Sequence, residues 1–323
     1  MIEEQQSIDN RTMVKGANNL LFITLLVYMG ASFAIEFLSI YFGEQLPFLR
    51  DTMFQLLMGQ GMLLLPSLIY LKKKHLKIGR FLHFKGLHPV TFLLVLVFTG
   101  ASYPIISLCN YLSLLVSENA IGGTVENLLA GYPLWAGVLV IAFVPCFVEE
   151  FIFRGTLYYS YKRSGIIKAG FCTAILFGFF HMNINQMSYA VVMGLLFFVL
   201  NEATGSILSS MLVHFLINAS SVVSSAAYYK QHGNLNTEVA QNQLSVPVTI
   251  IVLAIMSLFS LVILGFTLWG MVCLEKRKEV IIETFTNKNK EKCRVLSPTL
   301  VFALAICIAI MTLNQIAMMM QAG

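Results

Sequence analysis

The sequence predicts an all-α membrane protein, a polytopic bundle of about nine transmembrane helices with a cytoplasmic N-terminus. Composition is the first reason: of 323 residues, 57% are hydrophobic and only 11% are charged, and the mean hydropathy is +0.77. A soluble domain of this length is far less apolar. The second reason is that the apolar residues gather in runs long enough to cross a hydrocarbon layer of about 30 Å as helices.

Apolar runs of this length recur along the whole chain. The predicted spans lie at 18–42, 52–71, 89–117, 133–161, 165–183, 185–201, 205–229, 247–273 and 295–320. Only the polar turn Asn183-Ile184-Asn185 separates the fifth span from the sixth, so eight spans are the alternative.

Basic residues predict the orientation of these spans. With the N-terminus inside, all of the 21 Lys and Arg residues except Arg50, Arg154 and Lys230 fall in segments on the cytoplasmic side. An excess of Lys and Arg is typical of cytoplasmic loops. The net charge of +5 is spread over these loops and does not form one basic face, so we expect a lipid bilayer and no nucleic acid as a partner.

The predicted spans form one membrane domain with four parts. A cytoplasmic tail (1–17) precedes the first three spans (18–132), which include a basic, amphipathic segment at 72–88 suited to the headgroup layer. An ordinary basic loop is the alternative for this segment. A core of four spans (133–229) follows, and then the last two spans (230–323), joined by a basic cytoplasmic loop at 275–294.

Three charged residues lie inside the fourth predicted span. Glu149, Glu150 and Arg154 stand in the run Phe-Val-Glu-Glu-Phe-Ile-Phe-Arg, and each charge near a bilayer centre costs at least ~2.5 kcal/mol. Their spacing predicts that Glu150 and Arg154 pair on one helix face, while Glu149 points about 100° away and stays free. A purely structural ion pair is the alternative, but it leaves Glu149 unexplained.

Three further polar side chains fall inside predicted spans. His181 lies in the fifth span, and His214 and Asn218 share one face of the seventh. Counted from the cytoplasmic ends, these residues and Glu149 reach similar depths of about 14–20 Å, at 1.5 Å per residue. The sequence therefore predicts one buried polar site. Taken singly, His181 could be an interfacial histidine, and Asn218 could bond a neighbouring helix.

These residues form three short motifs in order on separate spans. The motifs are Glu-Glu-x-x-x-Arg (Glu149, Glu150, Arg154), Phe-x-x-x-His (Phe177, His181) and His-x-x-x-Asn (His214, Asn218). Over about 133–229 the chain thereby resembles the CAAX prenyl endopeptidase and bacteriocin-processing (CPBP, or Abi) family of intramembrane proteases. The resemblance implies that the Glu150–Arg154 pair braces the site, with Phe177 as further structural support.

The resemblance also implies catalytic roles. Glu149 would be the general base that activates water, and His181 would hold that water. His214 and Asn218 would donate N–H groups to the oxyanion of the tetrahedral intermediate, which peptide hydrolysis must stabilise.

Two kinds of mechanism remain open. Glu149, His181 and His214 could instead ligate Zn²⁺, since histidine nitrogen and carboxylate oxygen are its usual ligands. However, the sequence has no H-E-x-x-H pair, and Arg154 lies one turn from the carboxylates, where its charge disfavours a dication. We therefore favour a glutamate protease without a cofactor.

The family implies a membrane-associated peptide or protein as the substrate, of the CAAX, pheromone or bacteriocin type. The compact loops, with no soluble extension, lead us to expect an integral protein of a bacterial plasma membrane. The rival interpretation is a transporter, or a non-catalytic immunity or scaffold protein, because buried charges also line solute paths.

Overall fold

A computed structural model of the chain describes residues 10–75, 79, 82–119, 122–233, 245–286 and 294–322. Every regular element within these ranges is helical, which confirms the all-α prediction. The elements are α1 (Asn10–Phe42), η1 (Pro47–Arg50), α2 (Thr52–Lys73), α4 (Pro89–Leu114), α5 (Gly122–Gly131), α6 (Leu134–Gly137), η2 (Val138–Phe143), α7 (Val144–Glu150), η3 (Phe151–Leu157), α8 (Tyr158–Tyr161), η4 (Lys162–Ser164), α9 (Ile166–Phe179), α10 (Ile184–Thr204), α11 (Ile207–His232), α12 (Val246–Leu274), α13 (Lys278–Thr286) and α14 (Pro298–Ala322).

Eight helices in the described chain are long and apolar enough to cross a membrane. The fifth predicted span, 165–183, contains only the 14-residue α9, which is about 21 Å long at 1.5 Å per residue. The described chain thus has eight helices of full length, which is the alternative number of spans given above. One shorter helix, α9, lies beside them.

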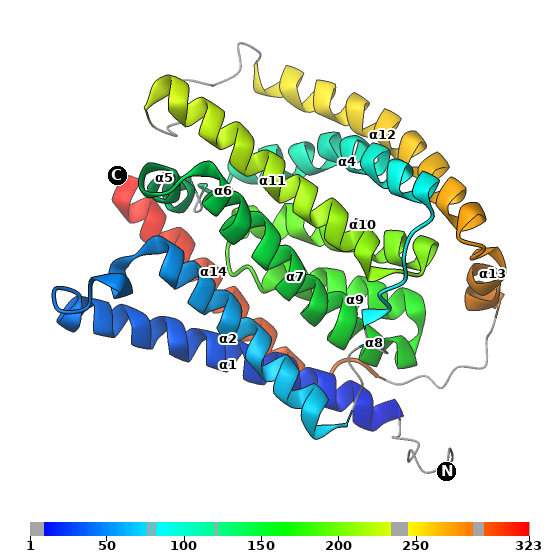
Figure 1. Cartoon of the computed structure of the whole chain (residues 1–323), viewed down its shortest axis with the longest axis horizontal. Coiled ribbons are helices and arrows are strands. Elements are labelled where there is room, and N and C mark those ends of the chain that lie inside the picture. The colour runs from blue at the N-terminus through cyan, green and yellow to red at the C-terminus, as the bar shows by residue number, and fades with distance from the viewer. Residues whose placement is uncertain are drawn as a thin grey trace.

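The helix that carries the glutamates lies in the middle of the bundle. α1 and α2 run along one side, α4 and α12 pack together on the other, and α7, α9, α10 and α11 lie between them (Figure 1). The helix 134–164 is 56% buried over its most apolar stretch, against 17–28% for α1, α2, α4, α12 and α14. The outer helices therefore shield the core helices from lipid.

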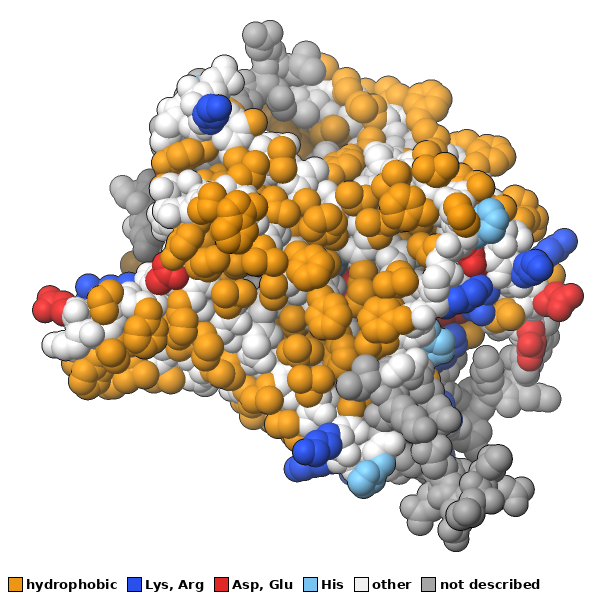
Figure 2. Space-filling view, viewed as in Figure 1, with side chains coloured by type: hydrophobic (Ala, Val, Ile, Leu, Met, Phe, Trp, Pro, Cys, Tyr) orange, Lys and Arg blue, Asp and Glu red, His pale blue; other side chains and the backbone are white. Residues whose placement is uncertain are grey.

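The outer surface of the bundle is apolar. Large side chains such as Phe33 and Phe266 (each 75% exposed) and Phe259 (69%) point outward. Figure 2 shows hydrophobic side chains across the middle of the visible face, with most of the basic side chains at its right and lower edges. Exposed apolar surface of this extent is stable in lipid and unfavourable in water.

Close packing of α9 on α10 fixes the position of the turn that carries His181. A Cβ atom at Gly194 would come within 2.7 Å of the Cα of Ala174, and one at Gly178 within 2.4 Å of a Val191 methyl. Small residues at such contacts let two helix backbones approach closely in a membrane. The two glycines therefore bring the end of α9 against the start of α10.

Asn18 joins the two ends of the described chain to the core. Its Nδ2 donates to the carbonyl of Val295 (2.7 Å) and to Ser297 Oγ (2.9 Å), and its Oδ1 accepts from the hydroxyl of Tyr161 (2.6 Å).

α1 already begins at Asn10, so the described part of the predicted tail 1–17 is helical. Parts of the predicted amphipathic segment (76–78, 80 and 81) and of the basic loop (287–293) lie outside the described residues.

Candidate active site

The two glutamates lie at a change of helix geometry. Glu149 and Glu150 end the α-helical α7, which lies between the π-helical segments η2 and η3. The wider turn is visible where Thr156 Oγ1 donates to the carbonyl of Phe151, five residues earlier (3.2 Å). Single π-helical turns inside α-helices often occur at functional sites, because the extra residue turns the following side chains to new directions.

Glu150 is fully buried and all of its partners are polar. Arg154 Nη1 lies 2.9 Å from Oε1, as the i,i+4 spacing predicts. The hydroxyl of Ser210 donates to Oε2 (2.6 Å), and His214 Nδ1 lies 3.2 Å from Oε1. A buried carboxylate is tolerated when a positive charge and hydrogen-bond donors surround it in this way. Glu150 therefore joins the helix 134–164 to α11.

Glu149 differs from its neighbour in burial and in partners. Its side chain is 15% exposed, against 0% for Glu150. Its Oε2 has no hydrogen-bond partner among the described residues, and the nearest recorded ring nitrogen, His214 Nε2, lies 3.8 Å away. This separation is too long for a hydrogen bond. Glu149 thus keeps a buried carboxylate oxygen without a hydrogen-bond partner.

His181 lies in the turn after α9, at the end of the shortest helix of the core. Its Nδ1 is 2.7 Å from the carbonyl of Phe177, and its ring stands edge-on to the Phe177 ring at 4.9 Å. A carbonyl only accepts, so we assign the proton to Nδ1. The other nitrogen, Nε2, is then left as an acceptor for water.

Asn218 lies opposite the start of α7. Its Nδ2 is 3.4 Å from the carbonyl of Ile141, a long hydrogen bond that spans α11 and η2. Pro145, four residues after Ile141, has no N–H to offer this carbonyl. The proline thereby leaves an acceptor that holds the Asn218 side chain, and the second amide N–H stays available.

One cavity of about 500 Å³ brings these side chains together. Glu149, His181, His214 and Asn218 all line it, as the estimated depths predict. Polar residues line the rest of the cavity toward the α5 end of the bundle, among them Gln60, Ser107, Asn110, Asn119, Thr124, Ser221 and Ser224. The cavity thus brings together a carboxylate, two imidazoles and an amide among other polar residues.

Comparison with known families agrees with this geometry. Residues 131–220 match the family model described as type II CAAX prenyl endopeptidase Rce1-like. This segment contains all seven residues of the three motifs, so the match confirms the predicted resemblance over this part of the chain. The comparison with curated proteins found no match, and neither did the comparison with solved structures.

Two residues that support the site, Ser210 and Phe197, were not predicted; both lie in the segment that matches the Rce1-like model. Ser210 donates to Glu150, and Phe197 stacks on the His214 ring at 5.2 Å and lies under the Arg154 guanidinium at 4.9 Å. Ser210 precedes His214 by four residues and so shares its helix face, a signal present in the sequence. Phe197 stands in the uninterrupted apolar run 190–200 and carries no such signal.

The side chains of the alternative zinc site are not arranged as a metal site. Among the described residues, no three His, Cys, Asp or Glu side chains are close enough to hold a metal ion. His214 directs Nδ1 at Glu150, and His181 directs Nδ1 at a backbone carbonyl. As placed, Glu149, His181 and His214 do not fit Zn²⁺, whose ligands lie at about 2.0–2.2 Å.

The buried pair predicts a strong effect on stability. Arg154→Met leaves the Glu150 charge without its counter-ion, so we expect it to lower the free energy of unfolding by ~3–5 kcal/mol. The double variant Glu150→Gln/Arg154→Met removes both charges and should regain a large part of this loss. Thermal unfolding in detergent micelles measures both effects. A single variant that melts like the unsubstituted protein, or a double variant no better than the single one, would contradict the pairing.

Proposed function

We propose that the chain is an intramembrane endopeptidase in which Glu149 activates the hydrolytic water without a metal. The observation that carries this proposal is the difference between two adjacent carboxylates. Glu150 is bound by Arg154, Ser210 and His214, whereas Glu149, which lines the polar cavity, has a buried oxygen without a hydrogen-bond partner. A general base needs such a free acceptor within reach of the water whose proton it takes.

The reaction follows from the positions of the donors and acceptors. Glu149 takes one proton from a water molecule that also donates to His181 Nε2. The water oxygen adds to the peptide carbonyl, and negative charge develops on the carbonyl oxygen. The second N–H of Asn218 and an N–H of His214 stabilise this charge. Glu149 then delivers its proton to the leaving amine, the C–N bond breaks, and the base is regenerated.

We infer that the peptide enters from the side of the bundle that carries α5. Asn119, between α4 and α5, and Thr124, in α5, line the cavity at the end opposite Lys162 and Arg277. If the basic end is cytoplasmic, the cavity opens to the extracytoplasmic side. The substrate would then be a peptide or membrane protein segment exposed on that side.

The arrangement gives less support to a transporter. A transport path must become accessible from both sides, whereas Glu150 and Arg154 close the inner end of this cavity with side chains that are 0% and 3% exposed. Ordered aromatic rings surround them, since Phe177 and Phe197 lie 4.2 and 4.9 Å from the Arg154 guanidinium carbon. A hydrolase needs access from one side only.

Substitution of the base tests the proposed activity. Glu149→Gln keeps the shape of the side chain and removes the acceptor charge, so we expect turnover to fall by at least about 10²–10⁴-fold, with melting near normal. Peptides released from membranes that carry the unsubstituted protein or the variant are compared by mass spectrometry. Glu36→Gln, which changes an exposed glutamate in α1, is the control. Release that persists in Glu149→Gln membranes would disprove this role.

Asn218 separates the glutamate mechanism from the zinc mechanism. We expect Asn218→Ala to lower kcat by about 10²–10³-fold with KM largely kept, because an oxyanion donor acts in the transition state. Ser221→Ala, on the same helix and the same cavity, should have little effect. Elemental analysis and treatment with a chelator complete the test on purified protein. Stoichiometric zinc, with activity lost on chelation and restored by metal, would overturn the metal-free proposal.

Cysteine labelling tests the side of entry. In intact cells, we expect a membrane-impermeant maleimide to label Ser221→Cys, which lies in the cavity, above the background of the native cysteines. Lys72→Cys, at the basic end of α2, should react only after permeabilisation. The reverse pattern would show that the cavity opens to the cytoplasm.

A further inference from the structure

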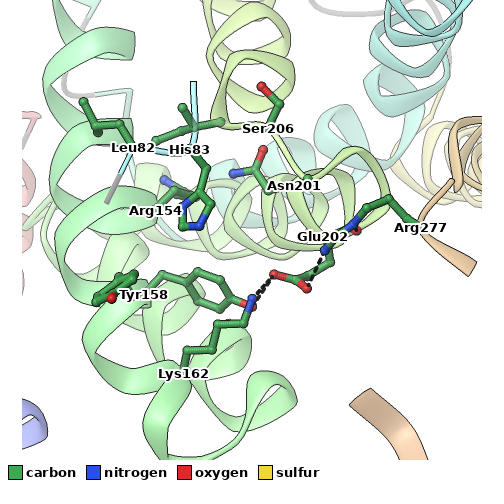
Figure 3. Close-up of a pocket in the computed structure, with 12 residues that line it drawn as sticks. Leu82, His83, Arg154, Tyr158, Lys162, Asn201, Glu202, Ser206 and Arg277 are labelled. Carbon is green, nitrogen blue, oxygen red and sulfur yellow. Dashed lines mark hydrogen bonds and ion pairs between the residues drawn. The ribbon is translucent and has the colours of Figure 1, made fainter. Parts of the chain in front are cut away.

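A second cavity lies on the other side of the Glu150–Arg154 pair. It has a volume of about 110 Å³ and opens at the basic end of the bundle, away from the cavity that holds Glu149. Its walls come from η3 and α8, from the turn between α10 and α11, and from the segments before α4 and after α12. Figure 3 shows its charged residues, with Lys162 and Arg277 on either side of the Glu202 carboxylate and Arg154 beside His83.

Positive charge predominates in the lining of this cavity. Arg154, Lys162 and Arg277 line it, and the one carboxylate among its described residues, Glu202, accepts from Lys162 Nζ at 3.0 Å and lies 3.6 Å from Arg277 Nη2. An ammonium group has three N–H donors and a guanidinium has five, so these contacts leave donors available. Gly205, Ser206 and Ile207, at the start of α11, also line the cavity. Four of the N–H groups there, from Ser206 and from Leu208 to Ser210, already donate within the protein, so the basic side chains are left to bind an anion.

Arg154 presents an unused donor in this cavity. Its side chain is only 3% exposed, Nη1 bonds Glu150, and Nη2 has no hydrogen-bond partner among the described residues. Arg154 lines the second cavity and is not among the residues that line the first. A buried charged donor without a partner is costly, so an acceptor is needed at this position.

The walls of the cavity are fixed by hydrogen bonds. Ser206 Oγ donates to the carbonyl of Lys85 (2.6 Å), and Glu275 accepts from the backbone N–H of His88 (2.8 Å) and from Lys85 Nζ (3.1 Å). Burial raises the pKa of the Glu275 carboxyl, but these hydrogen bonds outweigh burial and hold the pKa below its usual value. The segment before α4 is therefore held against the ends of α11 and α12 without a ligand.

We propose that this second cavity is a binding site for a phosphate group, held by Arg154 Nη2, Lys162 and Arg277. A phosphate offers several acceptor oxygens and negative charge, which suits two guanidinium groups and an ammonium group together. The group could belong to an anionic lipid headgroup or to a soluble phosphate, since the cavity opens at the end of the membrane-spanning helices.

A bound phosphate would act on the site through Arg154. The contacts run from Arg154 to Glu150 (2.9 Å) and from Glu150 to His214 Nδ1 (3.2 Å). An anion at Nη2 shares the charge of the guanidinium and so weakens its hold on Glu150. The site would thereby couple phosphate at the basic end to the position of His214, whatever reaction the cavity on the other side performs.

Direct binding measurements test this proposal without reference to protease activity. The probes are phosphatidic acid, added to detergent-purified protein and followed by native mass spectrometry, and inorganic phosphate, followed by calorimetry. We expect saturable binding of at least one probe, weakened about tenfold by Lys162→Gln and by Arg277→Gln, because each removes a charged donor. Lys162→Arg, which keeps the charge, should retain binding.

Neighbouring residues supply matched controls. Arg163→Gln and Lys278→Gln remove the same charge one position away, at residues that do not line the cavity, and should change affinity less than about twofold. Binding of the lipid alone identifies a headgroup, and competition between the probes identifies the phosphate itself. If neither probe saturates, or if the controls weaken binding as much as the cavity variants do, the proposal is wrong and the cavity holds water or attracts anions only by general charge.

Discussion

The burial of the Glu150 carboxylate is the constraint on which the rest of the core depends. Removing such a group from water costs several kcal/mol, which must be offset by partners in place at every moment. One partner, Arg154, comes from the same helix, and two, Ser210 and His214, come from α11. The register of α11 against the helix 134–164 is therefore fixed, and Asn218, one turn beyond His214, is carried to the carbonyl of Ile141.

The same interaction separates two cavities. Polar side chains line the cavity on the Glu149 side, and charged ones line the cavity on the Lys162 side. Between them lie the Glu150–Arg154 pair and the rings of Phe177 and Phe197. A protease in a membrane must admit water to its base without opening a path for ions. The layer formed by this pair and the two rings meets both needs, because protein groups bind the pair and no continuous chain of water molecules is required.

Much of this architecture could be predicted from local patterns. Hydropathy located the spans, and i,i+4 spacing predicted both the Glu150–Arg154 contact and the shared face of His214 and Asn218. The length of α9 was not predictable, because the apolar run continues into Phe180, beyond the helix end at Phe179. Ser210 was missed for a physical reason: a helical serine usually bonds a carbonyl of its own helix, and Ser210 also does so, to Ile207 (3.1 Å). Nothing in the sequence pattern distinguished the π-helical segments η2 and η3 from the α-helical turns beside them.

The proposed chemistry depends on the angle between neighbouring residues of a helix. Glu149 and Glu150 have the same side chain, but successive residues point about 100° apart, so one turns into the bundle and the other into the cavity. The π-helical turn that begins directly after them then carries Arg154 to Glu150 and away from Glu149, whose Oε2 stays unpartnered. If Arg154 bound both carboxylates, neither would be free to take a proton from water. One glutamate whose oxygens are both bound, beside another that keeps an oxygen without a partner, is therefore the arrangement that lets a membrane-buried carboxylate pair supply both stability and a base.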